Sequence, residues 1–503
     1  MHLDICMAAT TKASKDKPFS PVRAIAGSPE EAAKISAEKK DKGAASASSP
    51  ANINTSSNAF SHMMKRSAKV FSTNEGTKLA QRFHLNADGT LSLICYSTSP
   101  GLSQPDDIQW NTVVQLKVKT KAMHENTSDE SVDSDNPAAI DLSLSSAIPS
   151  SPRQSRLVHR HSRLSIPVLK SILQKSIRRR KPLPAVRVAM ELADKSLGDL
   201  LRRLPIIILE DSSLHPSFPL LIWLMVANSK NFAPNAFLMT KVFCCVYEMA
   251  SCPWQDHLTG EEEDGQGETL DPSLESYHQP GLDKRLEDHE ALIWSMLVRE
   301  RYGGMGGDMQ MLRAYANLWN ERFRKDCDVP DTVRRRVEAF QSDGITTTTL
   351  RWSMIPTMIH QNAMRQSLGR VQPILEQGLA SLTFMDITTE GVDFHCSSVL
   401  DGLVSDTEFI ERCCTQLNDI SASLDLRPVP FSITEKRIWL ERVLKRCMWK
   451  YSAGVNRRLP MREIDTTSAS ALNKDDALQN FWLNFILPKT KSFAEKYVKE
   501  RLG

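Results

Sequence analysis

A run of positively charged side chains between Arg153 and Met190 has the composition of a phosphate-binding surface. This stretch holds eleven Lys or Arg residues and no acidic residue. On a helix, its cations would recur over two or three turns, which is the spacing needed to follow a phosphate backbone. The predicted nucleic-acid-binding residues are Lys170, Lys175, Arg178, Arg179, Arg180 and Lys181.

The same basic run has two other interpretations. Cations near the C-terminal end of a helix offset the negative end of its dipole, and a short basic cluster is also typical of a nuclear-import signal. The whole chain carries a net charge of only +3, so binding to DNA or RNA would depend on this local run. The alternative function is a helical scaffold that binds only protein partners. The sequence leaves the oligomeric state open.

The segment "DFHCSS" at 393–398 places a thiol beside an imidazole, which suggests a nucleophile or a metal ligand. Adjacent residues do not face each other in a helix or strand, and a catalytic Cys and His usually meet across the fold. Structural roles for His395 and Cys396 are therefore favoured. Other Cys and His residues lack the usual spacing of zinc ligands: Cys252, His257, Cys413 and Cys414. We predict no catalytic residue, no metal and no cofactor, and hence a protein that is not an enzyme.

The glycine-rich segment "YGGMGGDM" at 302–309 could cradle a phosphate. The Walker pattern GxxxxGK[ST] is absent from the chain, and no predicted strand precedes these glycines. A sharp turn between two helices is favoured instead, with Asp308 as the N-cap of the second helix.

The elements that would position these residues are mostly helices. From about residue 164 onward, apolar residues recur every three or four positions, as on the face formed by Leu169, Ile172, Leu173 and Ile177. Aromatic residues at the same spacing are expected in the core. The predicted fold class is mainly α: one large multi-helix domain at 164–503, with an exposed loop at 255–283.

Three segments are expected before this domain. Residues 1–64 are rich in Ala, Ser, Lys and Pro, a composition typical of disorder. Residues 65–122 form a possible small β segment, because alternating residues flank the turn-forming pair Asp88–Gly89. Residues 123–163 are acidic and Ser-rich and then basic, and we interpret them as a linker.

The compartment is predicted from cysteine usage and from the apolar stretches. The chain has ten cysteines but no CxxC pair and no recognisable secretory signal, which favours reduced thiols. The apolar run "PLLIWLMVA" at 219–227 is too short to span a bilayer. We expect an intracellular protein, nuclear or cytoplasmic, with no membrane partner.

Residues of about 170–216 carry a resemblance to a known family. The matching residues are Gln174, Lys175, Ser176, Ile177 and Arg178, then Ala185, Ala189 and Leu192, then Arg202, Arg203 and Leu204, and finally Glu210 and Asp211. This stretch resembles the helical region that follows the ATPase module in replication-associated recombination ATPases, which are clamp-loader-like AAA+ proteins. The resemblance implies a collar-type helical domain used for oligomerisation and assembly near DNA, without ATP hydrolysis.

Within the resembling stretch, opposite charges are close in sequence at one end. Arg202 and Arg203 are expected to form structural ion pairs with Glu210 and Asp211 of the same or a neighbouring copy.

Overall fold

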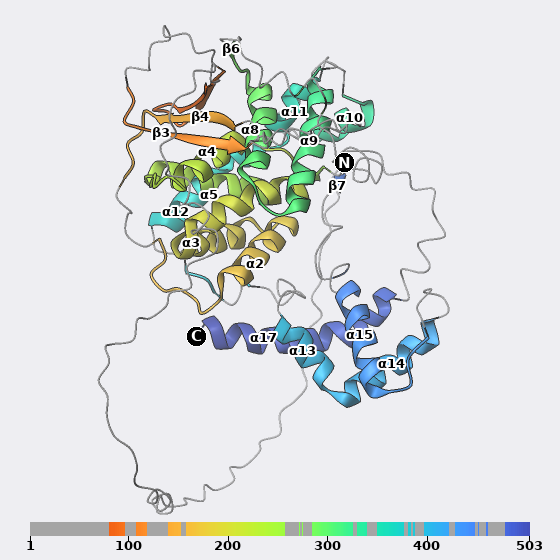
Figure 1. The fold of residues 1–503 in the computed structure, drawn as a ribbon. Helices are drawn as coiled ribbons and strands as arrows, with labels where there is room; N and C mark the ends of the chain where they lie inside the picture. The colour runs from red at the N-terminus through yellow and green to blue at the C-terminus, as the bar shows by residue number, and fades with distance from the viewer. Residues whose placement is uncertain are drawn as a thin grey trace, which may run out of the picture. The chain divides into compact units, whose positions relative to one another are not determined.

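The computed structural model describes a mainly helical protein with a small sheet, which confirms the predicted fold class (Figure 1). The described residues belong to one compact unit within 75–503. They are residues 80–95, 107–117, 139–151, 157–256, 271, 274, 284–324, 329–339, 350–376, 381–383, 386–387, 397–421, 428–447, 451, 459–460 and 478–502. The predicted disorder of 1–64, and His257, His395 and Cys396, lie outside them.

The sheet has the strand order β3-β4-β1-β2-β6. Its strands are β1 (Ala80–Leu85), β2 (Leu91–Cys95), β3 (Trp110–Lys117), β4 (Ala139–Ser146) and β6 (Lys284–Arg285). The predicted hairpin is present: β1 and β2 pair antiparallel around a turn in which Gly89 has a φ of 74° and Asp88 Oδ1 accepts the Thr90 N–H. Strand β4 pairs parallel with β1 and antiparallel with β3.

Strand β4 corrects the prediction that 123–163 is a linker. Its sequence "AIDLSLSS" alternates apolar and polar residues, and Leu142 and Leu144 are fully buried. Residues 157–164 are also held in place, because the N–H groups of Leu157 and Val158 donate to the carboxylate of Asp194. The second half of the expected linker is therefore partly built into the fold.

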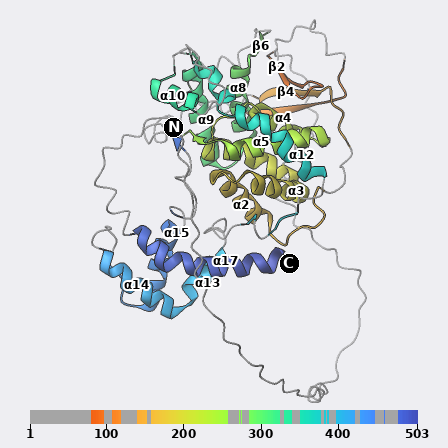
Figure 2. The same cartoon turned by 180° about the vertical axis from the view of Figure 1, so that it is seen from behind.

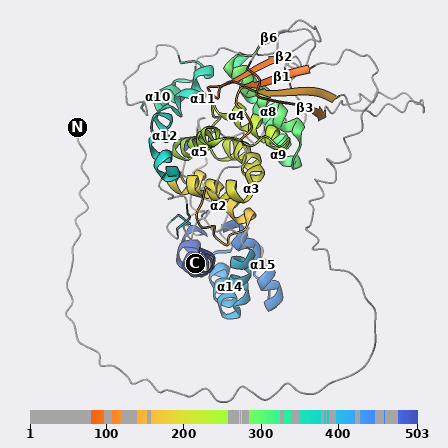
Figure 3. The same cartoon turned by 90° about the vertical axis from the view of Figure 1, so that its left-hand side faces the viewer.

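The apolar face of the sheet packs on two helices, α4 (Phe218–Asn228) and α8 (Asp288–Tyr302) (Figure 3). Trp223 of α4 donates its indole N–H to the carbonyl of Phe83 at 3.0 Å, and the rings of Phe83 and Trp294 meet edge to face at 5.1 Å. Ten consecutive residues of α4, 218–227, are buried, so this helix lies at the centre of the core.

The remaining helices of the body include α3 (Pro182–Asp211), which packs against α4. The others are α2 (Ile166–Arg178), α5 (Ala236–Ser251), α9 (Gly306–Arg324), α10 (Asp331–Ala339), α11 (Ile355–Met358) and α12 (Gln361–Glu376). The predicted apolar face of α2 is buried. Prolines occupy the first turn of α2, α3 and α4, where a missing N–H costs little. Helix α3 has a kink at Ser196, whose φ and ψ are not helical.

A second group of helices follows in the chain. It comprises α13 (Ser397–Ser405), α14 (Thr407–Ser421), α15 (Ile433–Cys447), a π-helical turn (Trp482–Ile486) and α17 (Leu487–Leu502). Two very short strands, β5 (Trp254–Gln255) and β7 (Leu459–Pro460), pair parallel. Most of the expected loop at 255–283 lies outside the described residues. Of the exceptions, Gln255, Asp256 and Leu274 are buried rather than exposed, and Asp271 is half-buried.

The glycine-rich segment joins two helices, as predicted, but Asp308 is not the N-cap. Helix α8 ends at Gly303, which has a φ of 94°, and α9 already begins at Gly306. Asp308 therefore lies within the first turn of α9, where its charge still faces the positive end of the helix dipole.

Candidate nucleic-acid interface

The end of α2 does not present all of its cations to solvent. Lys175 is 3% exposed and Arg178 is 6% exposed, because α3 packs along α2. Lys170 is half-buried, and its Nζ lies 3.1 Å from Asp199 Oδ1. The prediction that Lys175 and Arg178 contact phosphates is therefore corrected: both side chains belong to the interior of the fold. Lys170 is already engaged in an ion pair.

Arg178 takes part in a polar network that joins the C-terminal end of α2 to the C-terminal end of α3. Its Nε pairs with Asp211, which is 1% exposed. Gln174 donates its amide N–H groups to Glu210 Oε2 at 2.8 Å and to Asp211 Oδ2 at 2.6 Å. Arg203 lies 3.3 Å from Glu210 Oε2 and also donates to the Gln174 carbonyl oxygen. Five residues of the resembling stretch thus meet in one structural cluster: Gln174, Arg178, Arg203, Glu210 and Asp211.

The predicted pair between Arg203 and Glu210 is present, and Asp211 pairs with Arg178 of α2. Arg202 is exposed. Burial raises the pKa of Glu210, and the neighbouring carboxylate of Asp211 acts in the same direction against the attraction of Arg203.

The three cations that follow α2 lie in a tight turn. The Lys181 N–H donates to the Ser176 carbonyl, and the Arg180 N–H donates to the Ile177 carbonyl, both at 2.9 Å. These two bonds define a Schellman motif, in which the residue in Arg180's place adopts the left-handed region and is usually glycine. Arg180 has a φ of 58° and is exposed, while Arg179 and Lys181 are half-buried.

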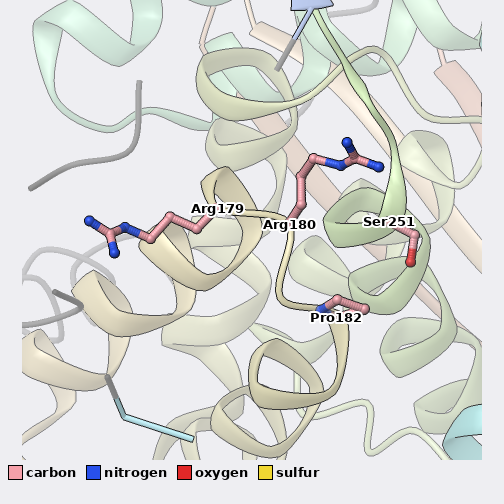
Figure 4. A pocket seen from close by; sticks show the side chains of 4 residues that line it. All are labelled: Arg179, Arg180, Pro182 and Ser251. Atoms are coloured by element: carbon pink, nitrogen blue, oxygen red, sulfur yellow. The ribbon is translucent and has the colours of Figure 1, made fainter. Parts of the chain in front are cut away.

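Two adjoining hollows border this turn. The larger one has a volume of about 450 Å³ and is lined by Arg179, Arg180, Pro182 and Ser251 (Figure 4). The smaller one, of about 220 Å³, shares Arg180 and Ser251 with the first. Its other described lining residues are Cys252, Pro253, Trp254, Val337, Met358, Ile359, Asn362, Ala363 and Gln366. The two guanidinium groups extend from the turn in opposite directions, so only that of Arg180 serves both hollows (Figure 4).

The cations at this corner can interact favourably with a negative ligand or with the negative ends of helix dipoles. No acidic residue is among the described residues that line either hollow. Helix α2 ends at Arg178 and α5 ends at Ser251, so the negative ends of two helix dipoles meet here. Cations at this corner therefore stabilise the fold as well, as the second interpretation of the basic run proposes.

A buried Cys, His and carboxylate meet elsewhere in the body. The Cys245 sulfur lies 3.5 Å from His215 Nδ1, and His215 Nε2 lies 3.0 Å from Glu248 Oε2. Ser367 donates to the other oxygen of Glu248 at 2.6 Å, and the Ser217 N–H donates to His215 Nδ1 at 3.0 Å. This is the order of a nucleophilic triad, and sequence reasoning missed it because His215 lies 30 positions before Cys245, which shares α5 with Glu248.

The chemistry of this buried cluster is structural. Burial raises the pKa of Cys245 well above its ordinary value, so the sulfur is a neutral thiol rather than a nucleophilic thiolate. Cys245 and His215 are at most 1% exposed. The cluster connects the start of α4 with α5 and α12. Cys413 and Cys414 on α14 are similarly inert, because burial raises their pKa to about 12 and about 11.

A Ser and a His also face each other in the sheet. His84 Nδ1 lies 2.9 Å from Ser145 Oγ, and His84 Nε2 lies 3.9 Å from Asp107 Oδ1. The first two residues are direct neighbours on paired strands, and Ser145 is 1% exposed. Burial lowers the pKa of His84, which keeps the ring neutral at physiological pH. This contact joins β1 to β4 and offers no opening for a substrate.

No protein family, no curated protein and no solved structure matches the chain. Among the described residues, every helix is too short or too polar to cross a bilayer, and no three metal-ligating side chains gather as a metal site would require.

Proposed function

We propose that the protein is a non-enzymatic accessory or scaffold protein in nucleic-acid transactions, and that it contacts phosphates through Arg179, Arg180 and Lys181. The observation that carries the proposal is the conformation of Arg180. A left-handed residue in a Schellman motif is strained unless it is glycine, and such strain is found where a side chain has a use. The use that fits an exposed guanidinium in an acid-free hollow is binding an anion.

The resemblance to the helical region of recombination ATPases supports the same proposal, because that region works near DNA. It supports no catalytic role, because the chain lacks a Walker sequence. The contacts would be made to the phosphate backbone, so binding would be salt-dependent and largely independent of sequence. DNA and RNA both present this backbone.

A second candidate is a scaffold that binds only proteins. The observation that favours it is the outer face of α12, where Met364 is 38% exposed and Leu368 is 58% exposed. Exposed apolar side chains close together on one helix are typical of protein contacts. Only the first candidate needs the basic turn, so a folded protein that binds no nucleic acid would favour the second.

The test is fluorescence-anisotropy binding of the full chain to DNA and RNA over a salt series. Exchange of Arg179, Arg180 and Lys181 to Glu is compared with the wild type. The control exchanges three exposed lysines of α17 to Glu and so makes the same change in net charge: Lys491, Lys496 and Lys499.

Three phosphate contacts predict a log–log salt slope of about −2.7 on duplex DNA, or roughly a 40-fold loss of affinity between 50 and 200 mM salt. We expect this slope to flatten in the first variant and to persist in the control. Equal slopes in both variants, or no binding at low salt by chains shown to be folded by circular dichroism, would overturn the proposal. A triple exchange to Gln removes the charges without reversing them, and it replaces the Glu variant if that chain does not fold.

A further inference from the structure

We infer that the smaller hollow, between the α2–α3 turn, the end of α5 and α12, receives the base of one unpaired nucleotide whose phosphates lie against Arg180 and Arg370. This inference rests on the proposed function and deepens it: it assigns a preference for single strands and names the residues that read the base. Helix α12 packs beside α5, which brings its hollow-facing residues opposite Ser251 (Figure 2).

The walls of the hollow match the two kinds of surface that a base presents. The lining includes the apolar residues Met358, Ile359 and Val337. It also includes Asn362 and Gln366, two residues with amide side chains on the first two turns of α12. An unpaired base is bound in this way, by apolar contact with its faces and by hydrogen bonds to its polar edge.

Ser251 provides an unused hydrogen-bonding group in the lining. Its Oγ is buried, and within the described part of the chain it has no hydrogen-bond partner. A buried hydroxyl that remains unpaired costs free energy, and native structures rarely leave one so without a reason. A ring nitrogen or an exocyclic oxygen of a base would pair with this hydroxyl.

One arginine lines the hollow, and a second lies further along α12. Arg180 lies on the turn, and Arg370 lies one helical turn beyond Gln366 on the same face of α12. Both arginines are exposed, and the only acidic residue of α12 is Glu376, at its end. Phosphates on either side of a bound base would meet these two guanidinium groups.

The size of the hollow selects a single base. Its volume is about 220 Å³, about half that of the neighbouring hollow. That is room for one heterocyclic ring system and not for a base pair. In a duplex the base would first have to leave the stack, which is unfavourable. A single strand is therefore expected to bind at least tenfold more tightly than a duplex of the same sequence.

The experiment measures anisotropy of the full-length protein with three oligonucleotides of equal length at one salt concentration: a single strand, its duplex, and an abasic single strand. Ala363→Trp fills the hollow, because Ala363 lines it. Met364→Trp is the matched control, since Met364 is the next residue on α12 and is exposed. Ser251→Ala removes the unpaired hydroxyl with little change in shape.

For the wild type and Met364→Trp we expect the single strand to bind at least tenfold more tightly than both the duplex and the abasic strand. Ala363→Trp should lose this difference while its duplex binding stays within twofold. Equal binding of the abasic and intact strands by the wild type would overturn the inference without any variant, so a misfolded Ala363→Trp chain does not protect it. In that case, duplex binding that still depends on Arg179, Arg180 and Lys181 would leave the proposed function standing.

Discussion

Replacing Arg180 with glycine tests whether the side chain is kept at a cost to stability. A non-glycine residue in the left-handed region costs about 1–2 kcal/mol, and glycine costs nothing there. Against this gain, glycine raises the conformational entropy of the unfolded chain, which lowers the free energy of unfolding by about 0.4–1 kcal/mol. Loss of a cation near two helix ends lowers the free energy of unfolding by a further ~0.3–1 kcal/mol. Arg180→Gly should therefore leave the free energy of unfolding close to that of the wild type.

Arg180→Ala isolates the backbone contribution, because it also lacks the guanidinium but keeps the strained conformation. The two variants should differ in their free energy of unfolding by the backbone strain of about 1–2 kcal/mol, reduced by the unfolded-chain entropy of glycine, about 0.4–1 kcal/mol. We expect the Gly variant to be more stable by about 0.8 kcal/mol, a factor of about four in the unfolding constant.

Urea unfolding followed by circular dichroism measures both variants. Asn231→Gly is the control, since Asn231 has a φ of 66° but asparagine tolerates this region, so its change should be small. Both Arg180 variants should lose the same share of nucleic-acid binding. An Ala variant at least as stable as the Gly variant would refute the strain argument, and unchanged binding in both would refute the reason given for keeping arginine.

Three further predictions concern groups inside the fold. Arg178→Ala leaves Asp211 buried without its cation, so urea unfolding should show that the free energy of unfolding falls by about 3–5 kcal/mol. The salt slope of nucleic-acid binding should stay the same. A flattened slope in folded protein would mean that Arg178 does contact phosphates. Burial pushes the pKa of Glu248 upward, but hydrogen bonds from His215 and Ser367 outweigh it and hold the pKa below its ordinary 4.5. The stabilisation by ionised Glu248 is therefore present above about pH 4.5, and it is lost as the pH falls through the lower pKa of the folded state. Glu248→Gln should flatten the dependence of the unfolding free energy on pH between about pH 6 and 3. An unchanged curve would contradict this. Cys245 should resist a thiol reagent at pH 8 until urea unfolds the chain, and rapid labelling of native protein would show that the buried cluster opens.

The helices were predictable because their signals are local. The apolar residues of α2 recur at helical spacing, and a proline lies in its first turn. Strand β4 was missed although Leu142 and Leu144 alternate with polar residues, because serines and a preceding acidic run give this stretch the composition of a linker. What makes it a strand is pairing with β1, whose residues lie about 60 positions earlier, and no local pattern reports that pairing.

The candidate site was predictable as a region but not residue by residue. At 100° per residue, Arg178 points away from the apolar face of α2, so periodicity alone predicts that it is exposed. It is buried because the end of α3 covers that side and supplies Asp211. The charge run identifies where cations gather. Which of them reach solvent is decided by a helix whose contact residue lies 33 positions further along the chain.

Only part of the basic run can contact phosphates, and this limits the affinity that the proposed surface can provide alone. With Lys175 and Arg178 inside the fold, the proposed contacts involve only the three cations at the turn. Three phosphate contacts give only a shallow salt slope, far from the value near −10 reached by a protein with an extensive interface. Stable attachment at physiological salt therefore needs a second source of affinity. A base held in the neighbouring hollow supplies one within a single chain, and a second copy bound to the same strand supplies another by raising the effective concentration. The dependence of affinity on protein concentration and on oligonucleotide length separates these two sources, because only the second requires a strand long enough for two chains.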